Sequence, residues 1–295
     1  MSSARLLFIH ALSPIHIGTG QSLGAVDLAI ARDRATGMPV LPGSGIKGAL
    51  RDKAASRNAA NVVKMFGPET ENAADHAGGL VFGDGNLLLL PVRSIAGTFA
   101  WVTSEHLLRR FARDCKELNA DLPLTGLKFP PNVEQCLVSN PTRLMCGEGA
   151  GGRVVFEDLD FKSESSPAVG ALAQRLGRTL GFEPGYADSL AQRLCVVHDD
   201  VMAFLSQHAT DVVTRVALDH DTKTAKPGQL WTEESLPTES VLVSVVIAQP
   251  NRSTGTAAEL LASLDKIVAG STQFGGKSTV GRGRVALTLA EGVAP

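Results

Sequence analysis

A strand–helix–strand pattern that occurs once near each end of the chain is the feature that most constrains the fold. The expected elements lie at residues 6–17, 46–57 and 80–90 for the first unit, and at 240–247, 256–268 and 285–289 for the second. Two such units in sequence predict an α+β fold with a ferredoxin-like (RRM-like) βαββαβ core. The long stretch between them predicts that an insertion splits this core.

Hydrophobic periodicity predicts further elements between the two units. We expect a strand at 99–103, helices at 105–117, 167–180 and 187–207, and strands at 154–161 and 212–218, the latter followed by a polar excursion at 219–238. RNA-recognition domains with this core stack bases on aromatic residues of the sheet. Because aromatic residues make up only 5% of this chain, we do not expect bases to stack on the sheet here.

Composition excludes several other classes of protein. With 295 residues, 44% of them apolar, the chain is long enough to bury a core without disulfides or metal. No apolar run reaches the roughly 18 residues that a membrane span requires. The four cysteines stand far apart without a CxxC pair, which argues against a structural zinc site and favours a reducing cytoplasm. We therefore expect a cytoplasmic protein with no membrane partner.

A glycine-rich turn at residues 43–48, Gly-Ser-Gly-Ile-Lys-Gly, opens the first predicted helix. It matches GxGxxG, but Pro39 and Pro42 exclude the buried parallel strand that a dinucleotide site needs before it. What remains is a helix start that carries Lys47 and Arg51, four residues apart and on one face. Free N–H groups and two cations at a helix start form a phosphate-binding arrangement. An ordinary helix start with solvated cations explains the pattern equally well.

A second glycine-rich segment, at residues 275–284, packs four glycines and three cations into ten residues without an acid. Glycines allow the backbone to approach a ligand closely, and cations suit a phosphodiester chain. Although the net charge of the whole chain is −2, a local basic patch of this kind can bind phosphates. We favour contact with an RNA backbone over a flexible hairpin, which would not account for the absence of acids.

Asp27 lies between apolar neighbours on the irregular stretch after the first strand. Such a carboxylate could position a divalent ion or a nucleophilic hydroxyl, although a lone Asp is more often a turn residue or an ion-pair partner. His16 could act as an acid, a base or a phosphate donor, but could equally be structural. The sequence contains no HExxH helix and no GxSxG elbow, so nucleophilic Ser or Cys catalysis has no support.

Several of these segments resemble the RAMP superfamily of CRISPR proteins. The resemblance rests on residues 12–20 (LSPIHIGTG), 27–32 (DLAIAR) and 36–51 (TGMPVLPGSGIKGALR), and on the late glycine-rich segment. Residues 215–239, with Gln-Leu-Trp-Thr-Glu-Glu at 229–234, are similar to the repeated backbone subunit of the type III-B, or Cmr, effector complex.

This resemblance implies a division of the chain. Residues 1–123 and 240–295 would form the ferredoxin-like palm that holds the guide RNA. Residues 124–211, where the resemblance is weak, are expected from the sequence pattern to form a mostly helical insertion. Residues 212–239 would form a thumb hairpin, which wedges between guide and target. Leu230 and Trp231 would either form this wedge or pack within the thumb. Asp27 matches the catalytic aspartate of the family. The residues expected to bind RNA are His16, Gly43, Ser44, Gly45, Lys47, Arg51, Gly275, Gly276, Lys277, Gly281, Arg282 and Gly283.

The function that the resemblance implies is cleavage of target RNA complementary to a bound guide RNA, by a metal-dependent endoribonuclease within a complex. The 2′-hydroxyl of the target would attack the adjacent phosphate and leave a cyclic phosphate. Mg²⁺ or another divalent ion would bind weakly, together with the RNA phosphate, without a preformed metal site. Partners would be the guide RNA, single-stranded target RNA, copies of the chain in a helical stack, and other effector subunits. A non-catalytic guide-binding scaffold, or the related type III-A subunit, are the alternatives.

Overall fold

The computed structural model describes residues 3–20, 24–69, 76–118, 120, 122, 124, 126–147, 152–251 and 253–293. The strands are β1 Ser3–Ala11, β2 Val40–Leu41, β3 Leu80–Phe82, β4 Gly85–Arg93, β5 Phe99–Ser104, β6 Gln135–Val138, β7 Arg153–Phe156, β8 Leu159–Ser165, β9 Leu194–Val197, β10 Asp211–Leu218, β11 Ala225–Ser235, β12 Val241–Ala248, β13 Thr272–Gln273 and β14 Arg284–Ala290. The helices are α1 Gly43–Ser56, α2 Val62–Phe66, α3 Glu105–Glu117, α4 Pro167–Thr179, α5 Pro184–Arg193, α6 Asp199–His208 and α7 Ala257–Val268.

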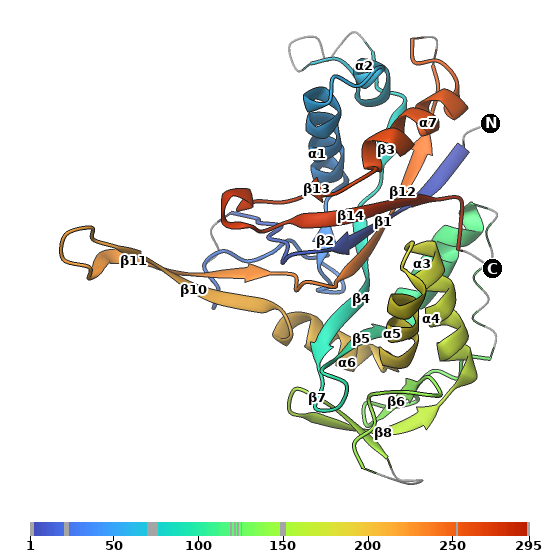
Figure 1. The fold of residues 1–295 in the computed structure, drawn as a ribbon, viewed down its shortest axis with the longest axis vertical. Helices are drawn as coiled ribbons and strands as arrows, with labels where there is room; N and C mark the ends of the chain where they lie inside the picture. Colours follow the sequence, from blue (N-terminus) through green and yellow to red (C-terminus); the bar gives the residue numbers. More distant parts are fainter. Residues whose placement is uncertain are drawn as a thin grey trace.

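The strands of both predicted units lie side by side in one large mixed sheet (Figure 1). Its central order is β14–β1–β12–β4, and every neighbouring pair in this group is antiparallel. The register pairs Phe8 of β1 with Val243 of β12 and with Thr288 of β14. The mixed α+β class predicted from the sequence is therefore confirmed, with α1 and α7 as the helices of the two units.

Strand β4 joins this central group to the strands of the insertion. Its first half pairs with β12, where Leu89 lies opposite Val241, and its second half pairs with β5, where Leu90 lies opposite Val102. From β5 the sheet continues through β9, β6 and β8 to β7. The expected strand at 80–90 is broken at Gly83, so that β3 and β4 both pair with β12.

Both faces of the sheet are covered. Strand β1 sends Leu7 and Ile9 into a core shared with α1 and α7, and Leu6 and Phe8 into a second core shared with α3, α4 and α5. A strand buried on both faces reads as a continuous apolar run, as β1 does. The second layer of helices, visible on the lower right of Figure 1, leaves this part of the sheet unable to stack bases, in line with the low aromatic content.

The two helices of the central units form for local reasons. In α7, Thr256 accepts a hydrogen bond from the backbone of Glu259, whose side chain accepts one from the Thr256 N–H. This capping box satisfies donors that a helix start otherwise leaves unpaired. In α1, Ile46, Leu50 and Ala54 recur at helical spacing and face the core.

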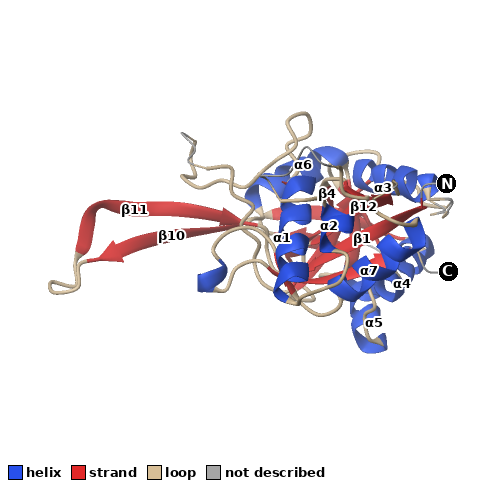
Figure 2. Cartoon of the chain, turned by 90° about the horizontal axis from the view of Figure 1, so that it is seen from above, coloured by secondary structure: helices blue, strands red, loops and turns tan. Residues whose placement is uncertain are grey.

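Strands β10 and β11 form a separate antiparallel hairpin that projects from the body of the molecule (Figure 2). Half-buried and exposed residues alternate along β10, as expected for a two-stranded ribbon that has no other layer packed along its length. The C-terminal part of β11 becomes buried where it enters the body. The hairpin spans most of the stretch 212–239 in which the thumb is predicted.

The structure corrects three expectations within the insertion. The helix predicted across 187–207 is wrong, because Leu-Cys-Val-Val at 194–197 forms the buried strand β9 between α5 and α6. The strand predicted at 154–161 is the hairpin β7–β8, with its turn at Glu157, where φ is +49°. The stretch 124–211 is therefore mixed, since β6 to β9 accompany its helices, and it is not mostly helical.

Candidate nucleic-acid interface

The start of α1 lies at a pocket of about 560 Å³. Lys47 and Arg51 line it from α1, and β3 with the preceding residues 76–78 lines the opposite side. Gly43 packs so closely on the backbone of Phe82 and Gly83 that any β-carbon would collide with it. The two predicted cations therefore do share one concave surface, together with Gly43 and Ser44.

The backbone donors at this helix start are less free than the sequence suggests. The N–H of Gly43 donates to Asp84 Oδ1 at 2.7 Å, and the N–H groups of Gly45 and Ile46 donate to the Pro42 carbonyl. One guanidinium N–H of Arg51 donates a hydrogen bond to the Pro68 carbonyl at 3.0 Å. Phosphate binding at this pocket would consequently depend on Lys47 and on the remaining N–H groups of Arg51, more than on the helix terminus.

The late glycine-rich segment folds back onto the stretch that follows β1. The N–H of Gly276 donates to His16 O at 2.9 Å, and that of Gly283 donates to Pro14 O at 2.7 Å. Gly275 and Gly283 have φ of +75° and +80°, and a β-carbon on either would collide with a backbone carbonyl. These glycines are needed for contact between two chain segments. Gly281, with φ of +82°, faces open space.

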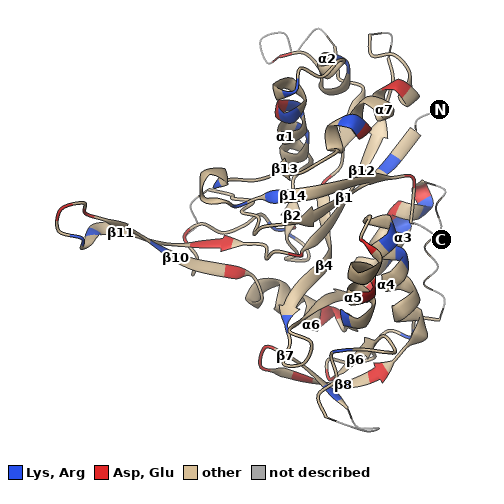
Figure 3. Ribbon diagram, in the orientation of Figure 1, with Lys and Arg blue, Asp and Glu red and all other residues tan. Residues whose placement is uncertain are grey.

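The cations of this segment are paired with acids of the hairpin. Lys277 Nζ lies 2.9 Å from Glu233 Oε1, and Arg282 Nη1 lies 3.9 Å from Asp211 Oδ2. The Arg282 side chain is only 14% exposed. Sequence reasoning left these cations free for RNA because the acids lie about 45 to 70 residues away in the chain. Figure 3 places the basic segment beside the acidic base of the hairpin.

Glu233 is 5% exposed and receives several donors at once. Trp231 Nε1 donates to its Oε1 at 2.7 Å, Lys277 contacts the same oxygen, and Arg215 Nε lies 3.5 Å from Oε2. Burial alone would raise the pKa of Glu233, but the donors from Trp231 and Lys277 outweigh it and hold the pKa below its usual value. Glu233 therefore fixes Lys277 against the hairpin as a carboxylate.

Asp27 is exposed, and β11 holds its carboxylate. The backbone N–H of Thr232 donates to Asp27 Oδ2 at 2.7 Å, and the Thr232 hydroxyl donates to the same oxygen at 2.8 Å. In return, the Asp27 N–H donates to Thr232 Oγ1 at 3.0 Å. The backbone donor, followed by the hydroxyl, lowers the pKa of Asp27 below its usual value. Asp27 is consequently ionised at neutral pH.

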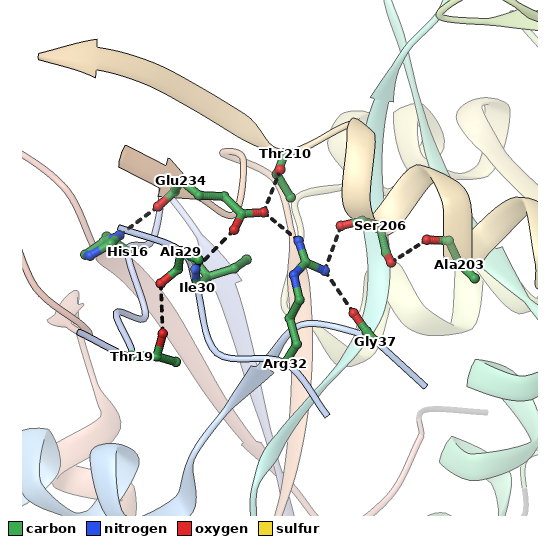
Figure 4. A network of polar contacts seen from close by, with 10 residues as sticks. All are labelled: His16, Thr19, Ala29, Ile30, Arg32, Gly37, Ala203, Ser206, Thr210 and Glu234. Atoms are coloured by element: carbon green, nitrogen blue, oxygen red, sulfur yellow. Dashed lines mark hydrogen bonds and ion pairs between the residues drawn. The ribbon is translucent and has the colours of Figure 1, made fainter. Parts of the chain in front are cut away.

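Glu234 anchors residues 30–32, which lie shortly after Asp27 in the chain (Figure 4). It is 5% exposed, and its Oε1 accepts hydrogen bonds from Arg32 Nη2 at 2.5 Å and from the Thr210 hydroxyl at 2.9 Å. Its Oε2 accepts from the N–H of Ile30 at 3.1 Å. Arg32 also donates to the carbonyls of Gly37 and Ser206. Residues 27–32, the hairpin and α6 are thus tied to one buried carboxylate.

His16 also lies at the base of the hairpin, where it is buried. His16 as a whole residue is 6% exposed, and its Nδ1 lies 2.7 Å from the Glu234 carbonyl oxygen. Because a carbonyl can only accept, Nδ1 carries the proton in this contact. This is the placement of a residue that joins the hairpin to the body, and RNA binding by His16 stays a prediction.

The two predicted wedge residues have different surroundings. Leu230 is 66% exposed, opposite Val216 on the hairpin. Trp231 is half-buried and its indole N–H is used by Glu233. Leu230 is free to contact a ligand, whereas Trp231 packs at least partly within the hairpin.

The structure therefore separates the predicted residues into two groups. Asp27, His16, Lys277 and Arg282 meet at the hairpin base, and the α1 cations line a pocket that no hairpin residue lines among those described. Sequence reasoning missed the residues that assemble the base. Three of them are consecutive on β11, one is on β10 and one follows Ile30 and Ala31: Thr232, Glu233 and Glu234, then Arg215, then Arg32.

Within the described ranges, no group of three or more His, Cys, Asp or Glu side chains is arranged to hold a metal ion. In that same part of the chain, no helix is both long and apolar enough to cross a bilayer. The described cysteines carry free thiols, three of which are buried.

A family model places the chain among known proteins. The model of the RAMP superfamily matches residues 8–286. The chain belongs to the RAMP superfamily. Within this superfamily it is 32% identical to the "CRISPR system Cmr endoribonuclease Cmr4" of Pyrococcus furiosus, over 98% of this chain and 96% of that protein. It is 26% identical to the "CRISPR system CMR subunit Cmr4" of Saccharolobus solfataricus, over 95% and 94% of the two chains.

Solved RAMP structures share the fold. The crystal structure of oligomeric Cmr4 from Pyrococcus furiosus superposes with a TM-score of 0.72 at 25% identity, covering 97% of each chain. A subunit of a type III-B Cmr-β complex bound to cognate target RNA gives a TM-score of 0.74 at 20% identity, over 97% of this chain and 96% of that one. The resemblance to the RAMP superfamily stated from sequence is thereby confirmed.

Proposed function

We propose that this RAMP protein is the backbone subunit of a type III CRISPR ribonucleoprotein, in which it binds guide RNA and cleaves complementary target RNA. The observation that carries the proposal is the 32% identity, over nearly the full length of both chains, to a protein named as a Cmr endoribonuclease. The pocket at α1 and the exposed carboxylate at the hairpin base supply the two surfaces that such a function needs.

The central strands and helices would form a ferredoxin-like palm. The order β14–β1–β12–β4, with antiparallel pairing throughout, supports this assignment. Guide phosphates would lie at the α1 pocket, where Lys47 and Arg51 provide charge. The projecting hairpin would reach between guide and target, with the exposed side chain of Leu230 as an apolar part of the wedge.

The chemistry would take place beside Asp27. The target 2′-hydroxyl would attack the adjacent phosphorus and form the 2′-oxygen–phosphorus bond, while the bond to the 5′-oxygen breaks. The products are a cyclic phosphate and a 5′-hydroxyl, with the proton of the 2′-hydroxyl lost and one gained by the leaving oxygen. Asp27, ionised and fixed by Thr232, would orient the attacking hydroxyl by accepting its hydrogen bond.

A divalent ion fits this site only as a loosely held partner. Asp27 Oδ2 already accepts two donors from Thr232, so Oδ1 is the carboxylate oxygen left for an ion. One carboxylate oxygen suits Mg²⁺ that keeps several waters and also binds an RNA phosphate. Such an ion would neutralise charge that develops on the phosphate.

The four free thiols suit a reducing cytoplasm as the location of the protein.

Asp27→Asn in a reconstituted complex tests the proposal. The amide keeps an oxygen that can accept from Thr232, but it carries no charge and is a poorer acceptor for a hydroxyl proton and a poorer ligand for a hard cation. Cleavage of end-labelled target RNA should fall at least a hundredfold, while guide and target affinities stay within twofold. Cutting at the wild-type rate in a well-formed complex would refute the assignment of Asp27.

A non-catalytic scaffold is the second candidate. One specific observation favours it: the Asp27 side chain already has a structural task, because it extends the pairing of residues 28–30 with β11. In that case Asp27→Asn would leave any cleavage of the complex unchanged, and Asp27→Ala would mainly lower thermal stability. The same cleavage assay, combined with a melting curve, therefore separates the two functions.

A further inference from the structure

The hydroxyl of Thr232 exchanges two hydrogen bonds with Asp27. It donates to Asp27 Oδ2 at 2.8 Å and accepts from the Asp27 N–H at 3.0 Å. The backbone N–H of Thr232 adds a third bond, also to Oδ2, at 2.7 Å. Among the described residues, the two hydrogen bonds to the Asp27 side chain therefore both come from Thr232 of β11 and converge on one carboxylate oxygen.

This arrangement fixes both the rotation and the charge of the carboxylate. With Oδ2 held by two donors, Oδ1 is left to face the solvent beside the hairpin. The two donors also lower the pKa of Asp27, the backbone N–H more than the hydroxyl. A carboxylate held in this state is a weak proton acceptor near pH 7. It is better suited to orienting a hydroxyl than to removing its proton.

We propose that Thr232 is a positioning residue for target cleavage, which fixes the Asp27 carboxylate so that Oδ1 is directed toward the target RNA. The inference rests on the proposed function, because it assumes that Asp27 acts on the RNA. Thr232 itself touches Asp27 and reaches the reaction only through it.

The position of Thr232 also ties the carboxylate to the hairpin. Thr232 lies directly opposite Thr214 on β10, and the next residue along, Glu233, holds Lys277. A displacement of β11 along its own axis would therefore move Oδ1. Since a misplacement of about 1 Å can cost about a hundredfold in rate, the seating of the hairpin would control the geometry for cleavage.

Three substitutions test the positioning role in the reconstituted complex. Thr232→Val keeps the shape and the backbone donor but removes the hydroxyl, and Thr232→Ser restores the hydroxyl. Thr214→Val is the matched control, since it makes the same change on the paired residue of the same hairpin. The measurements are the single-turnover cleavage rate at saturating target, the target dissociation constant and the melting temperature of the complex.

We expect Thr232→Val to lower the single-turnover rate about tenfold to a hundredfold, with target affinity and melting temperature unchanged within error. Thr232→Ser should recover most of the rate, and Thr214→Val should cut as the wild type does. If Thr232→Val cuts at the wild-type rate while Asp27→Asn is inactive, the positioning role is overturned and the proposed function stands. An equal loss of rate in Thr214→Val would also overturn it, because the effect would then belong to the hairpin in general.

Discussion

Single carboxylates organise the base of the hairpin. Glu233 and Glu234 are neighbours on β11, yet they hold different partners: Glu233 contacts the late glycine-rich segment through Lys277, and Glu234 contacts residues 30–32 through Arg32. Burial of a charge is costly unless it is paired and hydrogen-bonded, and both carboxylates meet that requirement. Two adjacent buried acids therefore join segments that lie far apart in the sequence.

The pair of Lys277 with Glu233 should contribute to stability in a pH-dependent way. The pKa of Glu233 is lower in the folded chain than its usual 4.5, so the carboxylate stabilises the fold above about pH 4.5, and this contribution is lost as the pH falls through the folded value. Lys277→Gln should lower the free energy of unfolding by about 1–2 kcal/mol at pH 7, and by progressively less below pH 4.5.

Chemical denaturation at pH 7 and near pH 4 would check this expectation. Lys226→Gln serves as a control, because Lys226 is an exposed lysine on β11, the strand that carries Glu233. A destabilisation by Lys277→Gln that is equal at both pH values would show that the ion pair is not its cause.

At the scale of elements, α1 and the hairpin present different kinds of surface. The pocket at α1 is lined by two cations together with glycines and apolar residues, and the adjacent Asp84 accepts the Gly43 N–H. The hairpin presents exposed apolar side chains along its length: Val212, Val216, Leu218 and Leu230. A phosphate backbone suits the first surface, and the faces of splayed bases suit the second.

Removing the α1 cations should weaken guide binding without regard to sequence. Phosphate contacts supply charge but no base readout, and each contact to single-stranded RNA contributes about 0.7 to the salt slope. Lys47→Ala with Arg51→Ala should therefore lower the slope of log affinity against log salt by about 1.4. Lys64→Ala on α2, a residue outside the pocket, is the matched control. An unchanged slope in the double variant would mean that this helix start is only structural.

Much of the element pattern could be predicted, because it depends on local periodicity. The apolar run of β1, the spacing of Ile46, Leu50 and Ala54, and the cap at Thr256 all act within a few residues. Strand β9 could not be predicted in this way, since four buried apolar residues between two helices also fit a helix. The sheet that surrounds β9 decides its conformation.

Only part of the candidate site was open to prediction, and the pairing of its residues was not. Asp27 and Lys277 were recognisable from their neighbours in the sequence. Thr232, however, lies 205 residues from Asp27, and no local pattern specifies that the two meet. For the same reason, the sequence did not reveal that Lys277 and Arg282 are paired with acids. Glu233 and Asp211 come close to them only in the folded chain.

At the scale of the whole molecule, the chain has the outline of a body with one projecting arm (Figure 2). A body that carries an arm on one side is suited to head-to-tail association, in which the arm of one copy reaches the next. Contacts of this heterologous kind build an open helical stack when the rotation between successive copies does not close into a ring. A related Cmr4 has been crystallised in an oligomeric form.

The purified chain should accordingly assemble on guide RNA. We expect sedimentation velocity to show larger species when guide RNA is added, with a size that increases with RNA length. Removal of the hairpin residues 217–227, with a short glycine linker in their place, should reduce this assembly and leave the melting temperature of the body nearly unchanged. A strict monomer at high concentration, with and without RNA, would count against a role as repeated subunit.

The pairing of strand β4 limits how chains of this kind can be cut and recombined. β4 is a single strand shared by two parts of the sheet, because one half of its length pairs with β12 and the other half with β5. The inserted region is therefore not a detachable module. Excising it would expose the edge of β4 and the apolar face on which α3 to α5 lie, and would invite aggregation at an unprotected edge. Chimeras between relatives should exchange the insertion together with β4 and β5.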